Sequence, residues 1–275
     1  MTYASLMVHV ELGHSNAGLL QITGDLAERF NSSVIGIAAY QPLQILYGEG
    51  FVCGDVVAQD LKELERETRE AEAEFRSALR GHVAALEWRS TLMFSSLSDY
   101  LVSEARSTDL VITGVAADAL LDTSRRVNIG DLVMQVGRPI IIVPAGASKL
   151  KLDRVVIGWK DTREARRAAF DALPLLKKAG HVVVVEIAAE EKLVAARAHL
   201  EDVVGWLKRH GIDAESLVSH STGDDTSGLY AIARDQGADI LVAGAYGHRR
   251  LREWALGGVT RDLLLRTDCC ALISH

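Results

Sequence analysis

The sequence predicts an α/β protein made of two tandem domains, each built on a parallel β-sheet. Short apolar runs rich in β-branched residues alternate with longer segments in which apolar residues recur every three or four positions. That alternation is typical of right-handed βαβ units, which bring successive strands into one parallel sheet. It occurs twice in 275 residues, a length that allows each copy to bury its own core.

The two copies resemble each other in sequence as well as in pattern. Residues 105–114 match residues 233–244 when a two-residue gap is allowed, and residues 6–11 parallel residues 155–160. We therefore interpret the chain as an internal duplication whose two halves share one fold.

The boundary between the halves falls in a stretch of small and polar residues that suits a linker. We place it near Gly146, which divides the chain into domains of residues 1–146 and 147–275. The N-terminal half also carries an insertion around residues 41–55, rich in glycine and aromatic residues. We expect this insertion to be a long loop over a site or over a neighbouring subunit.

The C-terminal half shows its elements clearly. Strands are expected at residues 155–159, 182–187, 214–219 and 238–243. Helices are expected at residues 163–178, 190–210, 227–236 and 259–265. Pro174 should kink the last turn of the first helix, and Gly211 suits the end of the second. The N-terminal half repeats this order, with a long helix at residues 59–79 whose Glu and Arg residues form a solvated face.

Composition and charge exclude several classes of protein. Hydrophobic residues make up 48% and charged residues 24%, an ordinary balance for a folded globular chain. The net charge of −7 lacks the basic footprint of a nucleic-acid-binding protein. The N-terminus has neither a basic leader nor a long apolar run, so we expect a cytoplasmic protein that does not enter a membrane.

The cysteines do not form a recognisable framework. Cys53, Cys269 and Cys270 are odd in number and two are adjacent, which is typical neither of secreted disulfides nor of a metal site. Packing is the simplest use for them, and redox sensing remains an alternative.

Glycines cluster after the strand at residues 238–243. Gly244 and Gly247 follow the strand directly, and Gly257 and Gly258 precede the helix expected at 259–265. Glycines let backbone amides approach an anion closely, and the first amides of a helix attract negative charge. The sequence therefore predicts a phosphate-binding cradle here.

The spacing of these glycines resembles the nucleotide-binding loop of the universal stress protein family. Residues 155–162 resemble the first strand and turn of that family, and residues 223–239 resemble the helix and turn before its fourth strand. The resemblance covers nearly the whole chain. It implies two flavodoxin-like domains, Rossmann-like in arrangement and of the adenine nucleotide α-hydrolase-like type. Each would hold a five-stranded parallel sheet of order 3-2-1-4-5.

The resemblance also implies a ligand and its site. The ligand would be ATP, or else AMP or ADP, with Mg²⁺ accompanying it, in the crevice between the first and fourth strands of the C-terminal half. The expected binding residues are Gly158, Trp159, Lys160, Ala243, Gly244, Gly247, Gly257, Gly258, Val259 and Thr260.

Two of these residues depart from the pattern of the family. Gly258 stands where the family has a serine or threonine, and Lys160 stands where it commonly has an aspartate. Lysine cannot accept a hydrogen bond from ribose or adenine, but it can meet a phosphate directly. Nearby, the basic cluster at residues 248–252 is either a solvated loop or a source of arginines, Arg249 or Arg252, for the phosphates.

The N-terminal half matches the nucleotide-binding pattern less well. Ala117 replaces the second glycine, and Gly130 is followed by Asp131, which would repel phosphate while capping its helix. Glu11 does occupy the place of the acid of the family. We interpret this half as a degenerate, structural copy, with binding of a nucleotide or another small ligand as the alternative.

The functional expectation is a stress-tolerance protein with regulatory nucleotide binding. No catalytic triad, Walker loop or metal motif is recognisable in the sequence. A scaffold that binds no nucleotide and a slow ATPase are the alternatives. The resemblance further implies that residues 140–143 pair with residues 271–274, so that the halves mimic a dimer within one chain and leave other surfaces for a homodimer.

Overall fold

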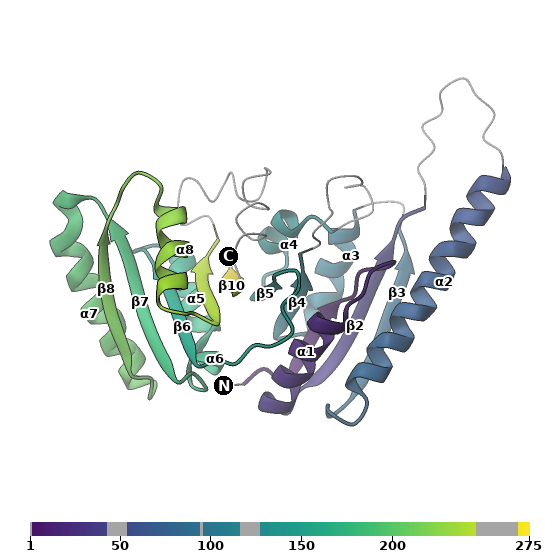
Figure 1. Ribbon diagram of the computed structural model, residues 1–275, viewed down its shortest axis with the longest axis horizontal. Coiled ribbons are helices and arrows are strands. Elements are labelled where there is room, and N and C mark those ends of the chain that lie inside the picture. The colour runs from purple at the N-terminus through teal and green to yellow at the C-terminus, as the bar shows by residue number, and fades with distance from the viewer. Residues whose placement is uncertain (1, 43–53, 94–95, 116–126, 246–268) are drawn as a thin grey trace, which may run out of the picture.

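A computed structural model describes residues 2–42, 54–93, 96–115, 127–245 and 269–275. Its strands form one ten-stranded sheet of order β3-β2-β1-β4-β5-β10-β9-β6-β7-β8 (Figure 1). The strands are β1 (Ser5–His9), β2 (Ser33–Tyr40), β3 (Leu86–Leu92), β4 (Leu110–Gly114), β5 (Ile140–Val143), β6 (Arg154–Trp159), β7 (His181–Ala188), β8 (Ala214–His220), β9 (Ile240–Gly244) and β10 (Cys270–Ser274). Each half has the predicted order 3-2-1-4-5, so the fold expected from the sequence is confirmed.

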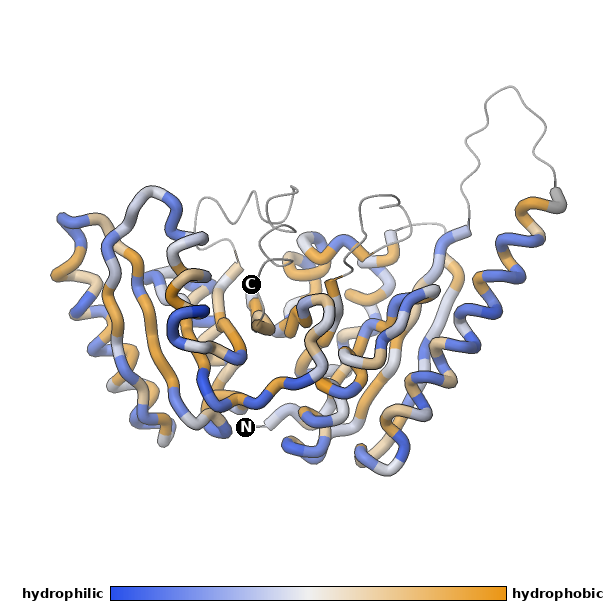
Figure 2. Tube along the Cα trace, in the orientation of Figure 1, coloured by the Kyte–Doolittle hydropathy of each residue, from blue (hydrophilic) through white to orange (hydrophobic). Residues whose placement is uncertain are grey.

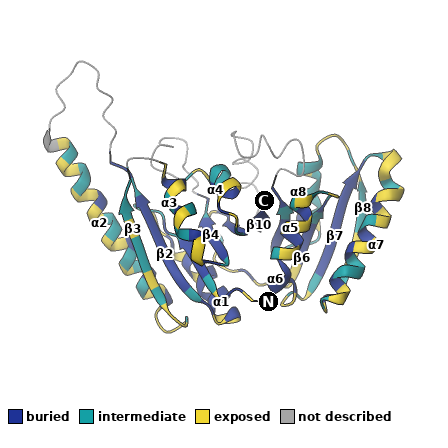
Figure 3. Cartoon of the chain, turned by 180° about the vertical axis from the view of Figure 1, so that it is seen from behind, coloured by how far each residue is buried: buried dark blue, intermediate teal, exposed yellow. Residues whose placement is uncertain are grey.

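Helices cover both faces of the sheet. One face carries α1 (Ala17–Phe30), α2 (Gly54–Leu79), α5 (Arg163–Asp171), α6 (Leu173–Leu176) and α7 (Leu193–Arg209). The other carries α3 (Leu97–Glu104), α4 (Ile129–Gln135) and α8 (Asp225–Asp235). Two short 3₁₀ turns, Ala105–Ser107 and Glu190–Lys192, precede β4 and α7. The central strands are buried between these layers, whereas the outward sides of the helices are exposed (Figure 3).

Local sequence explains where several helices begin and end. Thr162 precedes α5 and its hydroxyl accepts a hydrogen bond from the amide of Ala165, which caps the helix. The helix predicted at 163–178 is interrupted before Pro174, as expected, and continues as the short α6. Gly211 follows α7 at a φ of 78°, the left-handed conformation in which glycine ends helices.

Helix α2 is longer than the sequence analysis expected. It begins at Gly54 rather than at residue 59, so the last residues of the predicted insertion loop are helical. Apolar positions recur along one side of α2 and charged positions along the other (Figure 2). Leu64, Ala71, Phe75 and Leu79 are buried against the sheet and α1. The rest of the predicted loop, residues 43–53 with Cys53, lies outside the described residues.

The two halves meet through their last strands. β10 pairs antiparallel with β5, with Ala271 opposite Ile142 and Ile273 opposite Ile140, whereas every other neighbouring pair of described strands is parallel. The strand pairing that the resemblance implied is therefore present within one chain. One hydrophobic core runs through both halves beneath α1, α2, α5 and α7.

None of the helices within the described ranges combines the length and apolar character needed to cross a bilayer.

Cys270 is buried in β10, and burial raises the pKa of its thiol to about 12. Such a thiol is inert at neutral pH, which agrees with a packing role.

Candidate functional site

The candidate site lies where the strand order reverses in the C-terminal half. From β6 the chain continues to β7 on one side, and β9 pairs with β6 on the other. In open parallel sheets this reversal opens a crevice at the carboxyl ends of the two central strands. Gly158 of β6 lies opposite Ala243 of β9, and the chain leaves these strands at Lys160 and Gly244. Five of the predicted binding residues, Gly158 to Lys160 with Ala243 and Gly244, are thus brought together.

The other predicted binding residues cannot be placed. Gly247, Gly257, Gly258, Val259 and Thr260 lie outside the described residues, as do the basic cluster at 248–252 and the helix expected at 259–265. The phosphate cradle as a whole therefore stays a prediction from the sequence.

Helix packing accounts for the two described glycines of the site, most strictly for Gly244, whose neighbours are backbone atoms. A Cβ atom on Gly244 would lie 2.3 Å from the carbonyl carbon of Glu164, at the start of α5. A Cβ atom on Gly158 would lie 2.5 Å from Cδ2 of Leu229 in α8. Neither glycine has a positive φ. Both therefore let a helix approach the sheet closely, which is a structural reason for glycine that the sequence analysis did not consider.

The turn after β6 is held tightly. The amide of Thr162 donates to the carbonyl oxygen of Lys160 at 2.6 Å, and Asp161 forms an ion pair with Arg166. Burial opposes ionisation of Glu164, but hydrogen bonds from Arg163 and from its own backbone outweigh that effect and lower the pKa of its carboxyl. The first turn of α5 thus carries a carboxylate of its own.

Trp159 ends β6 at the edge of the candidate site. Its side chain is 8% exposed and belongs to the core beneath α5 and α7. Its indole Nε1 is buried and has no hydrogen-bond partner among the described residues. Buried indole N–H groups are normally paired, so this donor is unusual.

Glu186 is a site residue that the sequence analysis missed. It lies in β7 directly opposite Trp159 and is 7% exposed. Burial raises the pKa of its carboxyl, and Asp161 adds to this, while His199 and Lys160 act in the opposite direction. Its Oε2 has no hydrogen-bond partner in the described part of the chain, and Nδ1 of His199 is 3.7 Å away. A single glutamate inside the apolar run at 182–187 was the signal that could have found it.

The equivalent crevice of the N-terminal half holds different chemistry. His9 at the end of β1 lies beside Thr113 of β4, with Nδ1 and Oγ1 3.1 Å apart, and burial lowers the pKa of His9 to about 4. The amide of Glu11 donates to Asn16 at 3.0 Å. The cap of α4 is Asn128, whose side chain accepts from the amide of Asp131, so the expectation that Asp131 itself caps the helix was wrong.

The fold and this crevice define a tandem α/β protein with two flavodoxin-like halves. No protein-family model matches the chain, and a search of curated proteins gives no match. Among solved structures, the chain is similar to a universal stress protein from Archaeoglobus fulgidus DSM 4304, with a TM-score of 0.70, 15% identity, and coverage of 98% of this chain and 95% of that one.

Two structures from Pseudomonas aeruginosa are also similar. A functionally unknown protein from strain PAO1 has a TM-score of 0.57 at 13% identity and covers 99% of this chain and 92% of its own. A protein from strain UCBPP-PA14 described as a universal stress protein has a TM-score of 0.56 at 15% identity, with coverage of 99% and 93%. The chain therefore has the universal stress protein fold in its tandem form.

Proposed function

We propose that the protein acts in stress tolerance and binds an adenine nucleotide in the crevice between β6 and β9. ATP is the first candidate and AMP or ADP the alternatives, with Mg²⁺ accompanying the phosphates. The observation that carries the proposal is the reversal of strand order at β6 and β9, with Lys160 at the tip of β6. Ligands of open parallel sheets bind at such a reversal, and a lysine there offers a point charge to a phosphate.

The two halves have different roles in this proposal. Residues 147–275 form the nucleotide-binding domain and residues 1–146 a supporting domain. In the N-terminal half Asp131 lies in the first turn of α4, where its carboxylate would repel phosphate. We propose that the pairing of β5 with β10 makes the chain an internal pseudo-dimer, that further self-association uses other surfaces, and that the protein works in the cytoplasm.

The experiment is nucleotide analysis followed by titration. Protein purified without added ligand is denatured and its released small molecules are identified, and ATP with and without Mg²⁺ is then titrated into the apo protein. Binding at 100 times the dissociation constant should stabilise the fold by about 2.7 kcal/mol.

Two variants locate the site. Lys160→Gln should weaken ATP binding by about tenfold, because a charge-assisted contact to phosphate is lost. Lys178→Gln is the matched control, since Lys178 is exposed and precedes β7 at the opposite edge of the sheet. Equal affinity in wild type and Lys160→Gln would remove Lys160 from the site.

The second candidate function is a scaffold that binds no nucleotide. It is favoured by the finding that Gly158 and Gly244 are explained by the approach of α8 and α5. Purified protein free of nucleotide, with a melting temperature that ATP leaves unchanged, would support the scaffold and exclude the first proposal. Phosphate release measured on the same protein tests for slow hydrolysis.

A further inference from the structure

Glu186 has no role in the proposal so far, although it lies level with the rim of the crevice. Trp159 is opposite Glu186 in the register of β6 and β7. Gly158 is opposite Ala243 in the register of β6 and β9, which puts Gly244 one step further, at the level of Trp159. Glu186, Trp159 and Gly244 therefore form one row across three neighbouring strands at the carboxyl end of the sheet.

Glu186 and Trp159 also point to the same face of the sheet. Side chains alternate along a strand, and Val182 and Val184 of β7 pack in the same core as Trp159. Glu186 follows them at the same spacing. Side chains opposite each other on adjacent strands are neighbours, so the carboxylate and the indole lie side by side.

These two neighbours present an unused donor and an unused acceptor. Nε1 of Trp159 and Oε2 of Glu186 are both buried, and neither has a hydrogen-bond partner among the residues that the structure describes. Leaving such groups unpaired is costly, and each case calls for an explanation. Nδ1 of His199 lies 3.7 Å from Oε2, within ion-pair distance but beyond a hydrogen bond, and it is likewise buried without a hydrogen-bond partner among the described residues.

A comparison of the two halves shows that a buried acid at this position is particular to the C-terminal half. In the N-terminal half the residue after the first strand's apolar core is an acid, Glu11, and the residue in the place of Glu186 is Ala38. In the C-terminal half the strand tip is Lys160 and the acid lies one strand further, at Glu186. Glu186 is level with Trp159 and with the equivalent Val10, one residue before the level of Lys160 and Glu11.

We propose that Glu186 and Trp159 bind the edge of the nucleobase, with Nε1 donating to a ring nitrogen and the carboxylate accepting from the 6-amino group of adenine. This inference rests on the proposed nucleotide binding and names the group that selects the base. Purine edges carry an acceptor next to a donor, which matches the pair of atoms left unused here. A site built to hydrogen-bond an amino group rejects an analogue that lacks it, because the protein group is then left unpaired.

The test compares the affinities of wild type and a Glu186 variant for ATP and for an analogue that lacks the 6-amino group. Wild-type protein should bind ATP at least about tenfold more tightly than purine riboside triphosphate, which lacks the 6-amino group. In Glu186→Met this preference should fall to near unity, because the side chain keeps its length but loses its acceptor. Glu215→Met, an exposed acid on β8, is the matched control and should keep the preference.

A second variant separates the two contacts. Trp159→Phe removes the N–H donor but keeps an aromatic ring, so it should weaken ATP and the analogue by the same factor, since both carry the ring nitrogen. Circular dichroism and melting temperature establish that each variant is folded. Should Glu186→Met not fold, Glu186→Leu also removes the acceptor and serves in the same comparison.

The outcomes separate this inference from the proposed function. If wild type binds ATP and Glu186→Met retains the full preference over the analogue, the inference is wrong and the nucleotide proposal stands. Tighter binding of GTP than ATP by wild type would overturn the assignment to adenine. If wild type binds no nucleotide at all, both the proposed function and this inference are wrong.

Discussion

At the scale of single residues, the repeated sequence positions have acquired different physical roles. Gly114 and Gly244 end equivalent strands in the two halves. The nearest atom to a Cβ on Gly114 would be Cδ2 of Leu19 at 3.9 Å, an ordinary contact, whereas Gly244 is pressed against the backbone of α5. His9 of the N-terminal half likewise corresponds to Gly158, which has no titratable group. Equivalent positions of the two halves therefore differ in the space beside the backbone and in the titratable groups that they carry.

The glycine pair gives a prediction about stability. Gly244→Ala should lower the free energy of unfolding by about 1–3 kcal/mol, because the new methyl group meets backbone atoms that cannot move aside. Gly114→Ala should change it by less than about 1 kcal/mol, since the space is free and alanine reduces the entropy of the unfolded chain. Urea denaturation of both variants tests this, and equal effects would contradict the contact between Gly244 and α5.

His9 gives a prediction about pH. Burial lowers its folded pKa to about 4, so between pH 6.5 and 4 the unfolded chain binds the proton first. The free energy of unfolding should therefore fall as pH falls through this window, and His9→Gln should make the fall shallower. Denaturation at several pH values measures the effect. His82→Gln, at an exposed position, serves as the control and should leave the slope unchanged.

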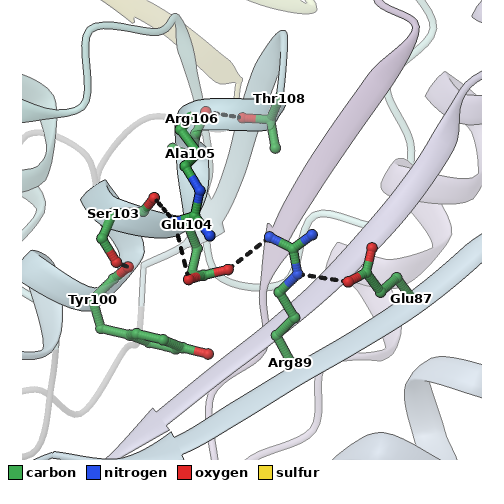
Figure 4. A network of polar contacts seen from close by, with 8 residues as sticks. All are labelled: Glu87, Arg89, Tyr100, Ser103, Glu104, Ala105, Arg106 and Thr108. Carbon is green, nitrogen blue, oxygen red and sulfur yellow. Dashed lines mark hydrogen bonds and ion pairs between the residues drawn. The ribbon is translucent and has the colours of Figure 1, made fainter.

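At the scale of elements, a network of ion pairs links the edge strand β3 to α3. Strand β3 lies at one edge of the sheet, and Arg89 on it contacts Glu104 at the end of α3 at 2.6 Å (Figure 4). Glu104 also meets Arg106 at 3.3 Å, and Arg89 meets Glu87 at 2.8 Å. The network ties the edge strand to the helix and to the turn that follows it.

The two acids of this network should differ in importance. The side chain of Glu104 is 15% exposed, whereas that of Glu87 is 57% exposed. Glu104→Gln should cost about 1–3 kcal/mol of unfolding free energy, because it weakens the partner of a largely buried guanidinium. Glu87→Gln should cost less than about 1 kcal/mol. Comparison of the two by urea denaturation in low and high salt tests the ranking, and a larger loss for Glu87→Gln would contradict it.

At the scale of the whole molecule, the two halves are expected to unfold together. They share the β5–β10 pairing and one continuous core, and Tyr3 of the N-terminal half donates to the carbonyl oxygen of Asp171 at 2.5 Å. The hydroxyl of Ser274 reaches the carboxylate of Asp171 at 2.9 Å. These contacts join the segment before β1, the last strand β10 and α5.

A core substitution in β10 tests this coupling. Leu272 is fully buried, so Leu272→Ala should cost about 2–5 kcal/mol. Fluorescence of single-tryptophan variants retaining Trp88 in the N-terminal half or Trp206 in the C-terminal half should report one shared, shifted transition. Two separate transitions in the parent proteins would show that the halves unfold independently.

The sequence by itself indicated the alternation of strands and helices, the duplication, and several of the residues at which helices begin or end. Apolar periodicity marks each element, and signals such as Thr162, Pro174 and Gly211 act on neighbours a few residues away. The duplication and the glycine spacing indicated a resemblance to the universal stress protein family, and the expected strand order came from that resemblance. The start of α2 was misplaced because its first turn follows an insertion without the apolar spacing of the rest.

Only the tertiary structure decided which residues meet at the site. The burial of Glu186 beside Trp159 depends on the register between β6 and β7, and the close contact of Gly244 with Glu164 depends on where α5 crosses the sheet. Both relations join residues far apart in the chain, and no local pattern encodes them. The sequence therefore indicated that a crevice exists and at which strands, whereas the packing of helices and strands determined which donors and acceptors line it.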